Sequence, residues 1–218
     1  MKGKNGFYAK YIKRFLDIIC SFAGMLVFSW LYLLIAVLIK IKLGSPVIYT
    51  ANRPGKIDPK TGKERIFKLY KFRSMTNDKD EHGNLLPDTQ RLTKFGKRLR
   101  ATSLDEIPEI YNIFIGDMSL IGPRPLALSY LQYYTEEEHH RHDVRPGLTG
   151  LAQVSGRNSL SWEDKFRYDL DYIDNLSFSL DVKVFLWTVL KVIKHEGIGQ
   201  GDEAPISLSI ERKKSKEI

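Results

Sequence analysis

The chain has 218 residues, of which 43% are hydrophobic, and this length and composition fit one folded domain with an appendage and exclude a disordered protein. Its 34 lysines and arginines exceed its 26 acidic residues and give a net charge of +8, which suits a polyanion, an acidic membrane surface or a phosphate-bearing substrate. The single cysteine, Cys20, excludes an intrachain disulfide and a paired-thiol metal site. We therefore expect the polar part of the chain to be cytosolic.

An uncharged run occupies residues 18–39, and its 22 positions exceed the roughly 20 that a helix needs to cross a membrane. The run is longer than the roughly 7–15 residues of a signal-peptide core, and no small-x-small cleavage site follows it. These features predict a membrane segment rather than a cleaved signal peptide or a buried soluble helix.

Basic residues flank the run at both ends, and they are Lys2, Lys4, Lys10, Lys13 and Arg14 before it and Lys40 and Lys42 after it. Because basic flanks favour the cytoplasmic side, both ends are expected there, which a re-entrant hairpin satisfies and a straight span does not. Ser29, near the middle, would hydrogen-bond a backbone carbonyl at the bend. The sequence leaves the spanning and re-entrant forms open.

Two β-prone runs, residues 47–50 and 65–72, are separated by a turn-rich stretch and predict a β-hairpin. The basic residues that this hairpin carries are Arg53, Lys68, Lys71 and Arg73. The polar residues 76–90 predict a surface loop.

The chain from Leu92 onward is mainly helical in pattern, and the predicted segments are 91–100, 105–116, 126–142, 161–176 and about 181–196. The last of these has an apolar stripe made by Val182, Phe185, Leu186, Val189, Leu190 and Ile193. This helix would pack on the domain core or lie at a lipid interface. The tail that begins at Glu211 is expected to be frayed and solvated, or to rest near anionic lipid.

Two adjacent carboxylates, Asp105 and Glu106, lie in the segment SLDEIPE. Ser103 and Glu106 match a capping box, whereas Asp105 as the cap would place Pro108 in the first helical turn, where no backbone donor is lost. Both alternatives put the carboxylates at a helix N-terminus, whose dipole stabilises carboxylates and also attracts phosphate. Taken alone, the pair is more typical of capping than of catalysis.

The adjacency of the two acids limits the chemistry that they could perform. Neighbouring residues of a helix do not face one another, so a proton-sharing dyad or a pair that brackets a sugar ring is not expected. One carboxylate as nucleophile or metal ligand, with the other supporting it, fits better. A carboxylate that attacks a diphosphate meets like charge and would need Mg²⁺ and arginines to neutralise the phosphoryl oxygens.

Further segments offer arginines for such chemistry. Arg124 stands between two prolines, which restrict the backbone and would hold its guanidinium as a phosphate clamp. The glycine-rich segment 145–158, with Arg157 near its end, would let backbone amides approach a nucleotide. The HHRH cluster at 139–142 offers metal ligands, but the neighbouring glutamates favour a solvated helical face.

The order of the segments is more specific than any one of them: a membrane helix, then NRPG, KLYKFRSM, SLDEIPE, GDMSLIGPRP, RPGLTGLAQVSGRN and SFSLDVKV. Together, over roughly residues 8–198, they resemble the bacterial sugar transferase family, the small monotopic phosphoglycosyl transferases. The resemblance implies an α+β, mainly helical fold, with an N-terminal membrane-inserted, re-entrant helix, a short β-hairpin and amphipathic interfacial helices around a compact cytosolic catalytic domain. We expect the membrane helix in 1–43, the catalytic domain in 44–200 and a flexible tail in 201–218.

The resemblance also implies a reaction, the transfer of a phosphosugar from a UDP-sugar to polyprenol phosphate (undecaprenyl phosphate) with release of UMP. This step would start surface glycan or glycoconjugate synthesis, such as that of lipopolysaccharide or capsule, at the cytoplasmic face of the bacterial inner membrane. Asp105 matches the nucleophile of the family, which forms a covalent phosphosugar intermediate and contacts Mg²⁺, and Glu106 matches its neighbour. The implied substrate-binding positions are Lys71, Arg100, Arg124, Arg157 and Asp181.

The expected partners are the UDP-sugar, polyprenol phosphate and membrane lipids, and a second copy of the chain is a further candidate, whereas nucleic acid is not expected. One departure from the family concerns the membrane helix, because small members often have Ser-Pro where this chain has Ser29-Trp30. Tryptophan keeps its amide donor, so the bend would lack the cause that proline supplies. Two alternatives explain part of the pattern: a membrane-tethered basic protein that binds nucleic acid or anionic lipid without catalysis, and a hydrolase of an activated sugar diphosphate.

Overall fold

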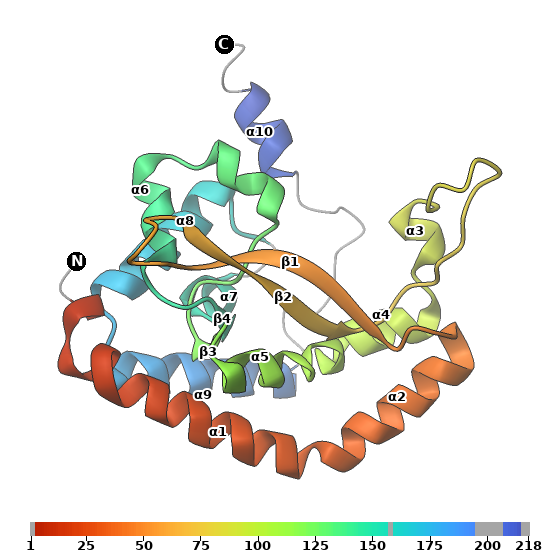
Figure 1. Ribbon diagram of the computed structural model, residues 1–218, viewed down its shortest axis with the longest axis horizontal. Coiled ribbons are helices and arrows are strands. Elements are labelled where there is room, and N and C mark those ends of the chain that lie inside the picture. Colours follow the sequence, from red (N-terminus) through yellow and green to blue (C-terminus); the bar gives the residue numbers. More distant parts are fainter. Residues whose placement is uncertain (1–2, 157–158, 195–206, 215–218) are drawn as a thin grey trace.

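The computed structural model describes residues 3–156, 159–194 and 207–214 (Figure 1). The fold is α+β and mainly helical, as predicted, with two small sheets of two strands each. The α-helices are α1 Lys13–Val27, α2 Ser29–Leu43, α3 Asp88–Arg91, α4 Lys94–Ala101, α5 Glu109–Ile115, α6 Glu136–His139, α7 Leu151–Ser155, α8 Trp162–Asp174, α9 Phe178–Lys194 and α10 Leu208–Lys214. The strands are β1 Ile48–Ile57, β2 Glu64–Phe72, β3 Ser119–Ile121 and β4 Gly147–Thr149.

The N-terminal apolar run, for which the sequence left a spanning and a bent re-entrant form open, consists of two helices that meet at a bend. Helical residues Tyr8–Val27 and Ser29–Leu43 meet at an angle of 60° (Figure 1). The Ser29 hydroxyl donates a 2.8 Å hydrogen bond to the Leu26 carbonyl, which confirms the contact expected of a serine at a bend. The bend therefore forms without proline.

The length of the bent pair bears on whether it can enter a membrane. Across the ranges that the structure describes, no single helix is both long and apolar enough to cross a membrane. The two halves together reach that length and composition, either as a broken span or as a re-entrant loop.

Strands β1 and β2 form the predicted antiparallel hairpin, with Ile48 opposite Phe72 and Arg53 opposite Phe67. Strand β1 continues to Ile57, so the prediction of a turn over its second half is wrong. The register shifts between Pro54 and Ile57, and this irregularity accommodates the proline inside a strand. On one face of the hairpin, Phe67 and Leu69 of β2 form a buried cluster with Ile113 and Met118.

The second sheet joins distant parts of the chain, because β3 and β4 pair in parallel, with Ser119 opposite Gly147. A core of Ile121, Val154, Tyr172, Ile173, Leu176 and Val184 lies between this sheet and helices α8 and α9. Within the segment expected to be a flexible tail, α10 places Leu208 in a buried cluster with Trp162 and Phe166.

The predicted helix over 126–142 is instead a chain of short pieces. A 3-10 helix covers Leu128–Tyr133, α6 follows, and a second 3-10 turn covers His140–Asp143. The break has a local cause, because the Thr135 hydroxyl accepts from the Glu138 amide while the Glu138 carboxylate accepts from the Thr135 amide. This capping box starts a new helix at residue 136 and ends the preceding turn.

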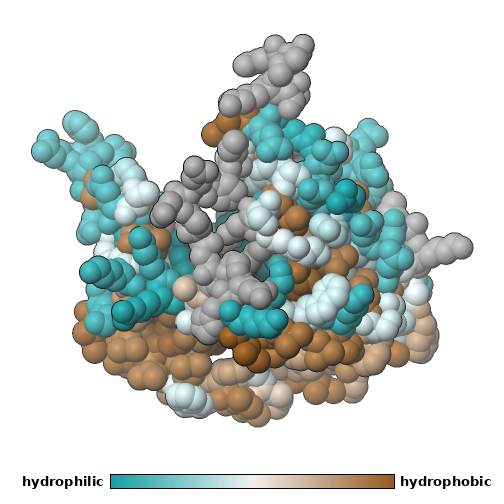
Figure 2. Space-filling model, turned by 180° about the vertical axis from the view of Figure 1, so that it is seen from behind, coloured by the Kyte–Doolittle hydropathy of each residue, from teal (hydrophilic) through white to brown (hydrophobic). Residues whose placement is uncertain are grey.

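Apolar side chains gather along one edge of the molecule (Figure 2). Helices α1, α2 and α9 line that edge in Figure 1. The stripe predicted on the last helix, from Val182 to Ile193, is 38–68% exposed, so it does not pack on the domain core. We call the exposed apolar surface of α1, α2 and α9 the apolar edge.

Polar contacts join the N-terminal helix to the domain. The Arg14 guanidinium donates to the carbonyls of Ile113 and Phe114 at 2.6 and 2.7 Å, and these carbonyls belong to the last turn of α5. A cation at the C-terminal end of a helix satisfies carbonyls that lack partners within the helix and complements its dipole. The Arg14 side chain of α1 therefore caps the C-terminal end of α5.

Candidate active site

A tight turn places the two adjacent acids between α4 and α5. Ser103, with φ of 55°, is left-handed, a conformation that costs roughly 1–2 kcal/mol in a residue other than glycine. Its side chain makes no capping bond, and Pro108 occupies the N-cap position of α5, so both capping alternatives are wrong. Asp105 and Glu106 lie in a short 3-10 turn, Leu104–Glu106, that precedes the helix.

Glu106 holds two cations on one oxygen. Its Oε1 accepts from Lys71 Nζ at 2.8 Å and from Arg124 Nη2 at 2.6 Å, and the side chain is 13% exposed. Burial alone would raise the pKa of Glu106, but Arg124 and Lys71 outweigh it and hold that pKa at about 2. Glu106 is thus a fixed anion that positions a lysine and an arginine.

Asp105 is buried as well, at 8% exposed, but it has different surroundings. Among the residues that the structure describes, no side chain or backbone amide hydrogen-bonds its carboxylate or forms an ion pair with it. Burial and the neighbouring Glu106 raise the pKa of Asp105, while the charges of Lys71, Arg100 and Arg124 oppose them. Its oxygens are therefore not committed to protein donors, unlike those of Glu106.

The structure adds a third carboxylate, Glu109, to which the sequence analysis gave no role. Glu109 is 2% exposed, and its Oε1 lies 2.9 Å from Lys71 Nζ in an ion pair that lacks hydrogen-bond alignment. Burial raises the pKa of Glu109 to about 7, although Lys71 opposes it, and the nearby Glu106 adds to the rise. The available sequence signal was its place in SLDEIPE, three residues after Glu106.

The backbone of Arg124 is fixed by a hydrogen bond from a second arginine, Arg141. Its carbonyl accepts from Arg141 Nη2 at 2.8 Å, and Arg141 forms a buried ion pair with Asp169 at 2.7 Å. Its own charge faces Glu106, whose carboxylate raises the pKa of Arg124 against the effect of burial. Arg124 is therefore fixed at both its backbone and its side chain.

Arg100 reaches the same site from α4, where its Nε donates to Ser74 Oγ at 2.8 Å. The structure thus brings together the five predicted site residues Lys71, Arg100, Asp105, Glu106 and Arg124.

One predicted site residue, Asp181, is not part of this cluster. Asp181, at the start of α9, accepts hydrogen bonds from Tyr8, Lys13 and Tyr172 at 2.5–2.7 Å and ties the N-terminal helix to the domain. Arg157 lies outside the described residues.

The glycine-rich segment packs on protein backbone. A Cβ on Gly147 would lie 2.1 Å from the Gly122 amide nitrogen, and one on Gly150 would lie 2.1 Å from the Gly122 carbonyl oxygen. Close approach of two chain segments therefore explains these glycines, and the parallel pairing of β3 and β4 depends on it.

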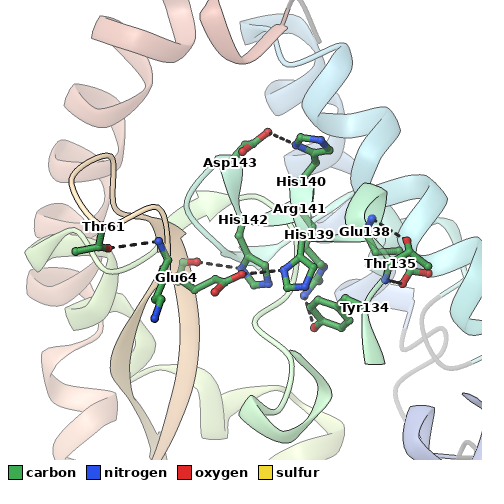
Figure 3. A network of polar contacts seen from close by, with 12 residues as sticks. Thr61, Glu64, Tyr134, Thr135, Glu138, His139, His140, Arg141, His142 and Asp143 are labelled. Atoms are coloured by element: carbon green, nitrogen blue, oxygen red, sulfur yellow. Dashed lines mark hydrogen bonds and ion pairs between the residues drawn. The ribbon is translucent and has the colours of Figure 1, made fainter. Parts of the chain in front are cut away.

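The HHRH cluster is not the solvated helical face that the sequence predicts. Arg141 and His142 are each 3% exposed (Figure 3). Arg141 pairs with Asp169, and the His142 Nδ1 lies 3.0 Å from the Gly55 carbonyl of the hairpin. His139 pairs with Glu64 and His140 with Asp143. The three histidines thus have separate partners, and within the described ranges no group of three or more His, Cys, Asp or Glu could hold a metal.

A mainly apolar pocket of about 270 Å³ adjoins Glu106. Phe28 at the bend between α1 and α2, Ile110 of α5 and Phe185 of α9 line it, and Glu106 and Lys191 contribute charged groups. The pocket therefore lies between Glu106 and the apolar edge.

The surroundings of Asp105 and Glu106 show which of the two carboxylates could bind Mg²⁺. Mg²⁺ in phosphotransfer sites commonly takes one or two carboxylates and completes its shell with water and substrate phosphates. Asp105 fits this use because its carboxylate is not engaged by a protein donor in the described part of the chain. Glu106 fits less well, because Lys71 and Arg124 both contact its Oε1.

Comparison with known proteins gives consistent matches. Residues 8–195 match the family described as bacterial sugar transferase. EpsL of Bacillus subtilis (strain 168), named an uncharacterized sugar transferase, is 47% identical over 189 residues, which cover 87% of this chain and 91% of EpsL.

Two relatives carry names that state a reaction. The UDP-glucose:undecaprenyl-phosphate glucose-1-phosphate transferase of Klebsiella pneumoniae is 40% identical over 190 residues, which are 82% of this chain and 39% of the relative. The UDP-N-acetylgalactosamine-undecaprenyl-phosphate N-acetylgalactosaminephosphotransferase of Aeromonas hydrophila is 37% identical over 191 residues, or 84% and 44%. The chain thus spans most of EpsL but less than half the length of these two transferases.

Proposed function

The chain belongs to the bacterial sugar transferase family, and we propose that it transfers a sugar phosphate from a UDP-sugar to undecaprenyl phosphate and releases UMP, in the synthesis of a glycan. The names of the relatives from Klebsiella pneumoniae and Aeromonas hydrophila support this reaction class. The observation that carries the proposal is the contrast between the two acids: Glu106 is fixed by two cations, whereas Asp105 is buried beside those cations without a protein donor of its own.

In the first half-reaction, a carboxylate oxygen of Asp105 attacks the phosphorus that bears the sugar. A bond forms between that oxygen and phosphorus, the bond to the bridging oxygen breaks, and UMP leaves with the electron pair. Lys71 and Arg124, which Glu106 positions, neutralise charge on the phosphoryl oxygens, and Arg100 adds to this field. When Mg²⁺ is bound at Asp105, it supplies further neutralisation of the diphosphate.

In the second half-reaction, an oxygen of undecaprenyl phosphate attacks the same phosphorus. The bond between phosphorus and Asp105 breaks, the sugar diphospholipid forms, and the carboxylate is regenerated. The apolar pocket beside Glu106 lets a lipid chain approach from the apolar edge while its phosphate reaches the acids. The two steps together leave Asp105 unchanged.

We further propose that the apolar edge rests in the cytoplasmic leaflet of the bacterial inner membrane and that the bent pair α1 and α2 enters it as a re-entrant hairpin. The basic residues at both ends of the pair support this orientation. The exposed apolar stripe of α9 supports contact with lipid at the same level.

The reaction is tested with purified protein, Mg²⁺, undecaprenyl phosphate and a panel of UDP-sugars. The wild type should release UMP with at least one sugar, and Asp105→Asn should abolish the release. Without the lipid acceptor, intact-protein mass spectrometry should show one added sugar phosphate on the wild type and none on Asp105→Asn. Asp171→Asn, which changes an exposed aspartate of α8, is the matched control and should behave as the wild type.

Each alternative function predicts a different outcome. Sustained UMP release without the lipid acceptor would indicate a hydrolase of the activated sugar. Absence of release with every UDP-sugar would indicate a binding protein. Undiminished release by Asp105→Asn would remove Asp105 as the nucleophile.

The membrane arrangement is tested by labelling in intact cells. Asn5→Cys in a Cys20→Ser background should resist a membrane-impermeant thiol reagent, because a re-entrant hairpin keeps residue 5 in the cytoplasm. Asn5 is exposed and suits the label, whereas a Cβ on Gly3 would lie 2.4 Å from the Leu176 amide nitrogen. Labelling of intact cells would contradict the hairpin and favour a span.

A further inference from the structure

Arg53 lies on the face of the hairpin that carries Lys71. Arg53 is opposite Phe67 in the register, and Tyr49 is opposite Lys71, four residues along each strand. Side chains of alternate residues share a face of a sheet, so Tyr49, Arg53, Phe67 and Lys71 project to the same side. Because Lys71 contacts Glu109 on that side, Arg53 faces the candidate active site.

The charges around Arg53 agree with this placement. Burial lowers the pKa of its guanidinium, the Arg124 charge lowers it further, and Glu109 opposes the change. Arg53 is therefore close enough to Arg124 and Glu109 for their charges to act on it.

Arg53 differs from the other cations of the site in its partners. Lys71 contacts two carboxylates, Arg124 contacts Glu106, and Arg100 donates to Ser74. The Arg53 Nε is buried without a hydrogen-bond acceptor, and within the described ranges no carboxylate forms an ion pair with this side chain. A buried guanidinium nitrogen without an acceptor is costly, and such exceptions occur at sites that bind a ligand.

We propose that Arg53 binds a phosphoryl group of the substrate. Arg53, Lys71 and Arg124 together form a cationic site, and of these three side chains Arg53 is the one that forms no ion pair with a carboxylate in the described ranges. A planar guanidinium matches two phosphate oxygens, which explains an arginine at this position. The identity of the anion rests on the proposed function, which offers two sources of the same chemistry: the diphosphate of the UDP-sugar and the phosphate of the lipid acceptor.

The first test measures binding without turnover. The affinity for UDP, determined by titration calorimetry on the detergent-solubilised full chain, should fall about 10- to 100-fold in Arg53→Gln, the range expected for a lost charge-assisted hydrogen bond. Arg53→Lys, which keeps the charge, should recover part of the affinity. Lys68→Gln is the matched control, because Lys68 is an exposed cation on the opposite face of the same hairpin.

The second test separates the two sources of phosphate. A higher KM of Arg53→Gln for the UDP-sugar, with the KM for undecaprenyl phosphate unchanged, places Arg53 on the donor, and the reverse places it on the lipid acceptor. Unchanged UDP affinity together with unchanged KM values for both substrates overturns the proposal.

A purely structural role is excluded by the melting temperature. Since Arg53 has a buried Nε without an acceptor, Arg53→Gln should melt at or above the wild-type Tm without ligand, and UDP should raise its Tm less. A lower Tm without ligand would overturn the proposal. Failure of the proposed function would look different from failure of this proposal. If the proposed function were wrong, the protein would release no UMP but could still bind UDP in a way that depends on Arg53.

Discussion

Glu109→Gln should make the stability of the protein less dependent on pH. Burial raises the pKa of Glu109 from 4.5 to about 7, and the side chain is 2% exposed. As the pH rises, the unfolded chain therefore loses this proton before the folded chain does. The contribution of Glu109 to stability is fully present below about pH 4.5 and is lost as the pH rises through about 7.

The size of the effect follows from the two pKa values. Their difference corresponds to roughly 3 kcal/mol, most of which is lost between pH 5 and pH 8. At roughly 2–4 °C per kcal/mol for a protein of this size, the wild-type Tm should fall about 5–10 °C further than the variant Tm over this range. Glu106 adds little, because its pKa of about 2 makes its contribution lost only in acid.

The assay is thermal unfolding of detergent-solubilised protein, followed by tryptophan fluorescence at pH 5, 6, 7 and 8. Trp162, which is 8% exposed, is a suitable reporter of the core. Glu81→Gln, at an exposed loop position, is the control and should follow the wild type at every pH. A Tm difference between Glu109→Gln and wild type that stays constant from pH 5 to pH 8 would refute the reasoning.

Three further predictions concern packing and the metal. Arg141→Met should lower the unfolding free energy by about 3–5 kcal/mol, because it strands the buried Asp169 carboxylate, and the double variant with Asp169→Leu should recover most of the Tm. Gly96→Ala should cost roughly 1–3 kcal/mol, because its Cβ would lie 1.8 Å from the Ser74 carbonyl oxygen, whereas Gly24→Ala, with its nearest contacts at 3.7 Å, should melt no lower than wild type. Chelation of Mg²⁺ with EDTA should stop UMP release, and excess Mg²⁺ should restore it; continued release in EDTA would contradict the metal requirement.

Local patterns in the sequence predicted much of the fold. β-prone runs predicted the hairpin, and helical spacing predicted α4, α8 and α9 close to their observed bounds, whereas α5 begins four residues later than the predicted segment. The exceptions have local causes that were legible in the sequence. Thr135 and Glu138 match a capping box that divides the predicted helix over 126–142. The Ser29 contact at the bend between α1 and α2, in contrast, was predicted.

The candidate site was predictable in its residues but not in its geometry. The resemblance selected Asp105 and Glu106, yet the contacts that distinguish them come from Lys71 and Arg124, which are 35 and 18 residues away from Glu106 in the chain. The role of Glu109 depends on its burial, which local patterning does not report. Sequence spacing likewise gave no reason to separate Asp181 from the site, because its partners come from the N-terminal segment and α8.

The contact of Arg14 with the end of α5 has a mechanical consequence. Because the Arg14 guanidinium of α1 donates to two carbonyls in the last turn of α5, and α5 begins just after the turn that carries the acids, these three parts are joined into one connected body. In a bilayer, a change in thickness would tilt the bent helix pair, and this body would tilt with it. The height of Asp105 above the acyl chains would then follow bilayer thickness while the spacing of Asp105 from its neighbouring cations stayed the same.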